Sequence, residues 1–549
     1  MVTQFFQDLR LEFNGYNQKK FLQDFMAGLT VTAVALPLAL AFGVSSGADA
    51  AAGLITAIIA GILIGGFSGA SYQISGPTGA MTAILLTLSV KHGIDGVFIA
   101  GFISGIILLL AAALHFGRLV SFIPSSVITG FTSGIAIIIA LGQVDNFFGT
   151  TSHGENALQK IFSYGELGFS PNMYAILFGI MVIIIMILWP KKWSSKFPSS
   201  LAGIIAALLI NWVFDLPVTV VGEIPKTLLP QSRLSFAGMS FAELQNLMGP
   251  ALSVAMLGMI ESLLCGASAG KMKNEKLNAD RELVAQGIGN VIIPFLGGVP
   301  ATAAIARTSV AIKSGGQTRL VSMFHSVGLL GSMFLLGSVM SMIPLSALAG
   351  VLIMTAWRMN EWNEIKYIFD KKFGISIIEF GVTMVATVMF DLTIAILIGV
   401  FIAIVLFVIK NCELKIDVSD VDLNRMNGHE ISTDHTYTKM VYLTGPLFFV
   451  TKDKLIQAVG RLNNAKNIIF SMRAVTSIDE SVVCEFEKIV SNYSKDNVKV
   501  LFCGVQDNVK TMFDRVGLTD MLGENSFYWD AVRAIKSLEN SEIVSSINK

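Results

Sequence analysis

Long apolar runs separated by short polar stretches extend from about residue 25 to residue 409 of this chain. A helix that crosses a bilayer needs about 20 predominantly apolar residues. By that measure the pattern predicts about fourteen membrane segments. They begin near residues 25, 50, 78, 96, 123, 172, 199, 249, 281, 304, 319, 345, 373 and 391. The segments near 78, 281 and 304 are short, polar or rich in Gly and Thr, so they are doubtful as full spans.

After Lys410 the pattern changes to that of a soluble domain. It predicts strands at 437–445, 446–450, 466–472 and 498–505, and helices at 452–464, 477–493 and 506–517, the last with Gly517 as its C-cap. Strands that alternate with helices predict a small α/β domain of about 110 residues. The chain therefore divides into an N-terminal segment (1–24), a transmembrane transport domain (25–410), a linker (411–434) and a C-terminal domain (435–549).

The composition supports a membrane protein. Only 14% of the residues are charged, against roughly 25% in soluble domains, and mean hydropathy is +0.66. The 39 basic and 39 acidic residues cancel, so nothing favours a nucleic-acid partner. The four cysteines and six histidines have no disulfide or metal-ligand spacing. We therefore expect no disulfide framework, no metal site and no cofactor, and the N-terminus has no signal-peptide pattern.

Basic residues in short loops predict the orientation in the membrane. If the N-terminus is cytoplasmic, three basic clusters fall inside, whereas the expected outer loops at 143–171 and 215–248 are mainly acidic. The pattern predicts an even number of spans with both termini inside. The clusters are Lys191, Lys192 and Lys196; Lys271, Lys273, Lys276 and Arg281; and Lys371 and Lys372.

Two interrupted segments share a pattern of small and hydroxyl residues after a proline, YQISGPTGAMTA at Pro77 and GGVPATAAIARTS at Pro300. A matched pair of this kind indicates a transporter's binding site. A helix that starts inside the membrane leaves unpaired N–H groups and a positive dipole end there. Two such ends facing each other predict an anion site, to which Ser75, Thr78 and Thr302 could add hydroxyl donors. The alternative is that these are Gly/Ala packing faces.

Ionisable residues within apolar segments are costly unless they are paired or hydrated. Arg307 follows the second interrupted segment. It supplies positive field to an anion, or else it pairs with Glu261 or snorkels to the membrane interface. Glu261 either takes a proton or cation during transport or is a structural hydrogen-bond partner. We interpret Asp391 as a helix cap and His325 as a packing residue rather than a proton relay. Glu379 has no predicted role.

Several segments resemble the SulP anion transporters, the family of prestin and pendrin, in the same order along the chain. They include ALPLALAFGVSSG, GLITAIIAGILIGGFSGASYQISGPTGA, FIPSSVITGFTSGIAI, GMIESLLC, AQGIGNVIIPFLGG, TAAIARTSV and FDLTIAILIGV. The C-terminal region resembles that family's STAS domain (sulfate transporter and anti-sigma factor antagonist). The resemblance covers nearly the whole chain and is closest to bacterial members.

The resemblance implies a uracil permease-like fold of seven plus seven inverted repeats, assembled as a homodimer in the bacterial inner membrane. It implies a core domain that carries the anion between the third and tenth helices and moves against a gate domain. It also implies that the acidic residue Glu261 serves the coupling cation, Na⁺ or H⁺. The residues expected to bind the anion are Ser75, Thr78, Gly79, Ala80, Thr302, Ala303, Ala304 and Arg307, and those expected at the coupling ion are Glu261 and Thr302.

The chain departs from the family's pattern at three places. Leu38 follows Pro37 where many relatives have Gln or Glu, which puts proton coupling through that position in doubt. Ala304 and Ala306 stand where some animal relatives have serines, so backbone N–H groups become more important. In the tail, Ser481 aligns with a serine that is phosphorylated in stand-alone relatives. Glu480 beside it would repel a phosphate, so an ordinary residue at a helix N-terminus is the alternative.

These observations predict a secondary active transporter, with symport as the expected mode, for sulfate or a related small oxyanion. The anion would be held by N–H groups of Gly79, Ala80 and Ala303, by the hydroxyls of Thr78 and Thr302, and by the field of Arg307. The alternatives are a bicarbonate or C4-dicarboxylate transporter of the same fold, an uncoupled anion channel, or a membrane-anchored sensor with a cytoplasmic partner for its STAS domain. An enzyme is not expected, because no nucleophile–base constellation is found.

Overall fold

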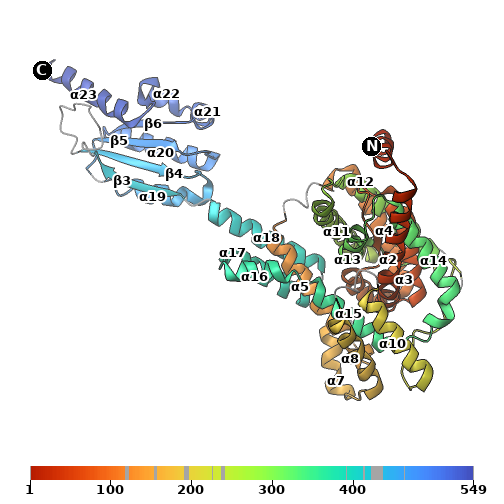
Figure 1. Cartoon of the computed structure of the whole chain (residues 1–549). Coiled ribbons are helices and arrows are strands. Elements are labelled where there is room, and N and C mark those ends of the chain that lie inside the picture. The colour runs from red at the N-terminus through yellow and green to blue at the C-terminus, as the bar shows by residue number, and fades with distance from the viewer. Residues whose placement is uncertain are drawn as a thin grey trace. The chain divides into compact units, whose positions relative to one another are not determined.

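The computed structural model divides into two compact units, Met1–Ala403 and Ile404–Lys549. It describes residues 2–117, 123–153, 157–190, 197–224, 227–235, 241–390, 392–411, 414–421, 437–462 and 464–547. Asp391 and the predicted cytoplasmic lysines 191, 192 and 196 therefore lie outside the described residues. Figure 1 shows the course of the chain, and each unit is described by itself.

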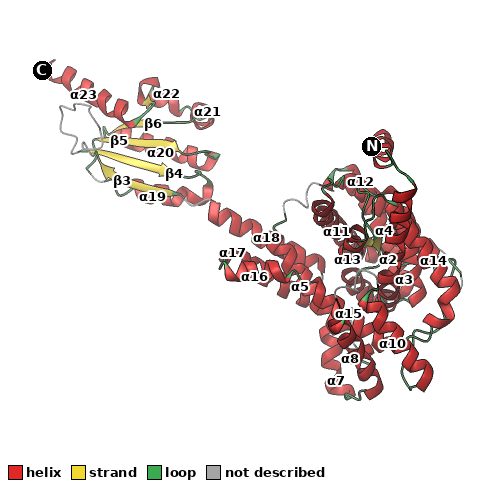
Figure 2. Cartoon of the chain, viewed as in Figure 1, coloured by secondary structure: helices red, strands yellow, loops and turns green. Residues whose placement is uncertain are grey.

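The first unit is built almost entirely of helices, and each of the fourteen predicted segments falls on one (Figure 2). By length and composition, six of the described helices are apolar enough to cross a membrane, and four shorter ones are also apolar. The helices are α1 (Val2–Glu12), α2 (Gln18–Ser45), α3 (Ala50–Phe67), α4 (Gly79–Ala113), α5 (Ser125–Gly142), α6 (Val144–Phe148), α7 (Ala157–Leu167), α8 (Met173–Leu188), α10 (Ser199–Phe214), α11 (Phe241–Lys273), α12 (Ala279–Ile292), α13 (Ile305–Lys313), α14 (Leu320–Met340), α15 (Leu345–Met359), α16 (Trp362–Asp370), α17 (Gly374–Met389) and α18 (Leu392–Asn411).

The segments predicted near 78 and 96 are the two halves of α4. Gly93 interrupts that helix with φ 69° and ψ −178°, a backbone conformation that residues other than glycine rarely adopt. The kink separates a shorter half-helix, which begins at Gly79, from a longer one, which ends at Ala113. The doubtful segment near 304 is likewise short, because α13 ends at Lys313.

Two groups of helices pack within this unit (Figure 1). One contains α2, α3, α4, α11, α12, α13 and α14, and the other contains α5, α8, α10, α15 and α17. Small residues allow close approach inside the first group: a Cβ on Gly53 of α3 would lie 2.0 Å from the carbonyl oxygen of Ala39 on α2. Such contacts are typical of membrane helices, which associate through close packing of small residues because lipid provides no hydrophobic driving force. The inverted symmetry of the two halves stays a prediction.

The second unit is an α/β domain, as predicted. Its five-stranded sheet has the order β3-β4-β5-β6-β7, with β3 antiparallel to β4 and the other pairs parallel. One face packs phenylalanines, including Phe470 and Phe502, under helices that contribute Phe486 and Phe513. The strands are β3 (Lys415–Asp420), β4 (Thr438–Thr444), β5 (Asn467–Ala474), β6 (Lys499–Cys503) and β7 (Phe527–Tyr528), and the helices are α19 (Lys452–Val459), α20 (Glu480–Lys495), α21 (Asp507–Arg515), α22 (Leu518–Leu522) and α23 (Ala531–Ile547).

Two predictions for this unit were wrong in detail. The expected strand at 446–450 is reduced to an isolated parallel bridge between Leu447 and Ile478, followed by a 3₁₀-helix at Phe449–Thr451. The hydroxyl of Thr451 accepts from the N–H of Phe448 and donates to its carbonyl oxygen, which favours the 3₁₀-helix. Part of the expected linker, Lys415–Asp420, forms β3 at the sheet edge, where its side chains are mostly exposed and its composition resembles a loop. The predicted C-cap residue Gly517 lies one position further along: Val516 caps α21, and Gly517 follows it in the left-handed conformation with φ 74°.

Candidate anion site

Two very short strands bring the interrupted segments together. β1 (Ser75–Gly76) pairs antiparallel with β2 (Thr302–Ala303), with Ser75 opposite Ala303 and Gly76 opposite Thr302. The N–H of Ala304 adds a bond of 2.9 Å to the carbonyl oxygen of Ile74. Proline disfavours helical backbone at the residue before it, so the chain is extended before Pro77 and becomes helical at Gly79. The two helices α4 and α13 consequently start beside each other.

The start of α4 is capped by a hydroxyl. Thr78 is the N-cap residue, and its Oγ1 accepts from the N–H of Met81 at 3.5 Å. The same hydroxyl donates to Oε2 of Glu261 on α11 at 2.8 Å. The N–H groups of Gly79 and Ala80 have no acceptor among the described residues. This helix end therefore offers free donors next to a hydroxyl–carboxylate pair.

The start of α13 has no side-chain cap, because its N-cap residue is Ala304. The N–H groups of Ile305 and Ala306 find no acceptor in the part of the chain that the structure describes. Instead, the first turn carries a cation whose side chain is only 1% exposed, Arg307. Both helix ends are thus electropositive, the second one more strongly.

Arg307 reaches from its own helix to the other interrupted segment. Its Nη2 donates to the carbonyl oxygen of Pro77, and its Nη1 has no partner among the described residues. A Cβ on Gly76 would lie 2.4 Å from Nη1, so the guanidinium occupies space that only a glycine leaves open. Among the described residues no ion pair joins Arg307 to Glu261, and the carboxylate of Glu261 accepts from Thr78 instead. The direct interhelical pair is therefore not formed in this state.

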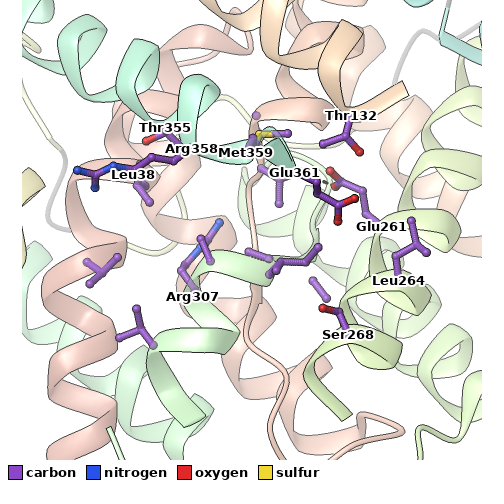
Figure 3. Close-up of a pocket in the computed structure, with 18 of the residues that line it drawn as sticks. Leu38, Thr132, Glu261, Leu264, Ser268, Arg307, Thr355, Arg358, Met359 and Glu361 are labelled. Carbon is purple, nitrogen blue, oxygen red and sulfur yellow. Dashed lines mark hydrogen bonds between the residues drawn. The ribbon is translucent and has the colours of Figure 1, made fainter. Parts of the chain in front are cut away.

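Both helix starts open into one cavity of about 1010 Å³. Figure 3 shows Glu261 and Arg307 on opposite sides of this space, on α11 and α13 respectively. Of the residues predicted from the sequence, those that line the cavity are Thr78, Gly79, Glu261, Ala303, Ala304 and Arg307.

Three predicted residues lie behind the cavity wall. Ser75 accepts a hydrogen bond from Gln286 at 3.0 Å, and Ala80 is fully buried. Thr302 is also fully buried, with its Oγ1 2.9 Å from Oγ of Ser262. The N–H of Ala303 donates to that same serine oxygen at 3.2 Å, so it is engaged within the protein. The free N–H groups at this end are those of Ile305 and Ala306, the first two residues of α13.

Four charged lining residues were not predicted as site residues. Lys271 and Lys313 come from the ends of α11 and α13, and Arg358 and Glu361 come from the opposite wall. Arg358 donates to the carbonyl oxygen of Met186 at 2.8 Å, and Glu361 accepts from Thr129 at 2.9 Å. The sequence did not indicate them as site residues, because each lies at the end of an apolar run, where charged residues are common. Leu38 also lines the cavity, and it presents an apolar surface there.

The other ionisable candidates lie elsewhere. Glu379 is buried between α17 and α5, where Ser126 donates to its carboxylate. His325 is fully buried on α14, and neither ring nitrogen has a partner among the described residues. In the second unit, Ser481 is exposed in the first turn of α20, directly after Asp479 and Glu480. Its phosphorylation stays a prediction.

Comparison with known proteins gives the family. The model of the sulfate permease family matches residues 21–386, which is more than half of the chain. This chain belongs to the sulfate permease family. The STAS domain model of that architecture matches residues 430–531. The family is one of anion transporters, so the protein is a membrane transporter and not an enzyme.

Relatives of this sulfate permease member cover nearly its whole length. The protein named "Putative sulfate transporter YvdB" of Bacillus subtilis is 33% identical over 527 residues, 94% of this chain and 97% of that one. The bicarbonate transporter BicA of Picosynechococcus sp. is 28% identical over 520 residues, 90% of each chain. Among solved structures, SLC26A9 matches 98% of this chain and 93% of its own with a TM-score of 0.81 at 16% identity, which shows the fold. The transmembrane domain of a cyanobacterial BicA matches 71% of this chain and 98% of its own with a TM-score of 0.63 at 28% identity.

Proposed function

We propose that this member of the sulfate permease family is a secondary active transporter of sulfate or a related small oxyanion. The observation that carries the proposal is the meeting at one cavity of two helix starts that have N–H groups without an acceptor among the described residues. Helix starts with free N–H groups attract anions, and here α4 and α13 begin side by side with the buried cation Arg307 between them. The anion would accept from the N–H groups of Gly79, Ile305 and Ala306, three residues that line the cavity.

The cavity is larger than one desolvated anion requires. Small-molecule sites commonly measure about 300–1,000 Å³, so a volume of about 1010 Å³ accommodates the anion with much of its hydration shell. We propose that this is a state open to one side, and that movement of the helix group holding α4 and α13 against the group holding α5 and α15 closes it. Alternating access by rocking or by an elevator movement would then follow.

Coupling is proposed to run through Glu261. Its carboxylate faces the cavity and accepts from Thr78, the cap of α4. Loading of Glu261 by Na⁺ or H⁺ would therefore change both the charge and the hydrogen bonding next to the anion. Thr302 would act from behind the wall through Ser262, the neighbour of Glu261. Operation as a homodimer in the bacterial inner membrane, with both termini in the cytoplasm, belongs to the same proposal.

Bicarbonate is the second candidate substrate. BicA matches 90% of both chains, and the transmembrane domain of a cyanobacterial BicA has a similar fold at 28% identity. Backbone N–H groups can donate hydrogen bonds to either anion, so the geometry of the helix starts supports both.

The deciding experiment is uptake into proteoliposomes of labelled sulfate, with bicarbonate, chloride and succinate as competitors, under imposed sodium or pH gradients. Saturable sulfate uptake driven by one gradient is the expected result and identifies the coupling ion. Strong uptake of labelled bicarbonate without sulfate uptake would show that bicarbonate is the substrate, and the protein would still be a transporter. Ion currents far above carrier turnover would show that it is a channel and not a carrier.

A further inference from the structure

Helix α12, one of the segments doubtful as a full span, carries a ladder of buried amides and a carboxylate. Glu282, Gln286 and Asn290 recur every four residues, which places them on one face of the helix. Their side chains are 0%, 0% and 1% exposed. Polar groups so deeply buried in a membrane domain are costly unless they are hydrogen-bonded. We call these three residues the α12 ladder.

The first rung holds the chain that leaves α3. Oε2 of Glu282 accepts from the hydroxyl of Ser68 at 2.6 Å and from the N–H of Gly69 at 3.0 Å. Its Oε1 accepts from Nε2 of Gln286 at 2.9 Å. Three donors thus satisfy this carboxylate, and they fix the beginning of the segment that leads into α4.

The second rung holds β1, and the third holds the residue before β2. Nε2 of Gln286 also donates to Oγ of Ser75 at 3.0 Å. Asn290 grips the backbone of Ala301 on both sides: its Oδ1 accepts from the N–H at 2.7 Å, and its Nδ2 donates to the carbonyl oxygen at 2.9 Å. Nδ2 of Asn290 also donates to the carbonyl oxygen of Gln286 at 3.0 Å, which joins the two rungs.

Both interrupted segments are therefore fixed to a single helix that does not itself line the cavity. The short β1–β2 pair, the bond of Ala304, Arg307 and the contacts of Ser262 and Thr308 also hold the two helix starts. The α12 ladder differs from them because one helix bonds to both segments ahead of the helix starts. We infer that the α12 ladder sets the register of the starts of α4 and α13, and that Gln286 and Asn290 are positioning residues for anion binding. This inference rests on the proposed function for its second half only.

The decisive variant is Asn290→Leu, which keeps the side-chain size and removes all three bonds. Asn211→Leu is the matched control, since Asn211 is a buried membrane asparagine whose amide makes one long bond of 3.4 Å to Met342, far along the chain from both segments. Asn290→Asp is an intermediate, because it keeps the acceptor for Ala301 and loses the two donations. If Asn290→Leu does not fold, Asn290→Asp and Gln286→Met carry the test.

The first measurement is hydrogen–deuterium exchange of the full-length protein, which does not depend on transport. Asn290→Leu should speed exchange in the peptide containing Ala301 and in the one containing Ser75, whereas Asn211→Leu should leave both unchanged. Asn290→Asp should preserve protection at Ala301 better than the leucine variant does. Unchanged protection in a folded Asn290→Leu protein overturns the ladder.

The second measurement is the split between KM and maximal rate for labelled sulfate and labelled bicarbonate. Misplacing a functional group by about 1 Å can lower the activity of a site about a hundredfold. We therefore expect Asn290→Leu and Gln286→Met to raise KM about ten- to a hundredfold at equal protein amount. Ser75→Ala should add little on top of Gln286→Met, since the two groups share one bond. An unchanged KM with altered exchange refutes the positioning role. A wild-type protein that moves neither anion refutes the proposed function, while the exchange result still decides the ladder.

Discussion

The start of α20 in the STAS domain and the starts of α4 and α13 in the membrane domain treat their first N–H groups differently. At α20 the carboxylate of Asp479 accepts from the N–H of Val482 at 3.0 Å and from that of Phe449 at 2.6 Å. At α4 the cap is the neutral hydroxyl of Thr78, and at α13 the cap residue is Ala304, whose side chain has no acceptor. All three ends have the same dipole. A helix start is therefore available to an external anion only where no carboxylate of the protein caps its N–H groups.

The largest effect is expected from giving α13 the cap that α20 has. Ala304→Asp would supply an internal carboxylate that accepts the free N–H groups and repels an anion in the cavity. We expect sulfate and bicarbonate uptake to fall below detection, while the helix start gains about 1 kcal/mol from the cap. Uptake and thermal unfolding are the measurements, with Ala304→Ser as the uncharged control. Wild-type KM in the aspartate variant would show that this end does not bind the anion.

Removing the buried cation should have the next largest effect. A charged hydrogen-bond donor contributes about 1.5–3 kcal/mol, so Arg307→Gln should lower anion affinity about ten- to a hundredfold. The protein should remain folded, because the rest of the β1–β2 contact is retained. Ser133→Ala, which deletes a buried hydroxyl that has no partner among the described residues, serves as the control for thermal unfolding. An unchanged affinity in folded Arg307→Gln protein would remove this residue from the site.

Loss of the hydroxyl cap of α4 should be milder. Thr78→Val keeps the shape but removes both the cap and the donor to Glu261. A neutral hydrogen bond contributes about 1 kcal/mol, which corresponds to a fall in anion affinity of about fivefold. Thr78→Ser restores the hydroxyl and should restore the affinity. Equal KM values for the valine and serine variants would contradict a role for this hydroxyl.

The smallest effect on transport is expected at the STAS domain. Asp479→Ala opens the start of α20 and should destabilise that domain by about 0.5–2 kcal/mol. Hydrogen exchange in α20 of the full-length protein measures the loss, and KM for the transported anion should stay the same. A raised KM would indicate that this helix start communicates with the cavity.

The sequence predicted the main architecture because its strongest signals are local. Runs of apolar residues fix the helices, and the proline-led pair at Pro77 and Pro300 correctly indicated two helix starts that meet. What it could not predict depends on the third dimension. The α12 ladder combines residues that are ordinary one by one, and the engagement of the Ala303 N–H requires Ser262 from another helix. The edge strand β3 was missed because exposed strands carry loop-like residues.

The bond from Arg307 to Pro77 joins positions 230 residues apart in the sequence. Ribosomes add roughly 5–20 residues per second, so the start of α4 is synthesised roughly ten seconds or more before the residues that complete its surroundings. During that interval the carbonyl oxygen of Pro77 lacks its native partner, the guanidinium of Arg307 from the second half of the chain. During synthesis, the start of α4 therefore exists for some time without its bond to Arg307, and its polar groups must be kept away from lipid until that residue is made. Slowed or truncated synthesis should expose the nascent protein to quality control at that stage.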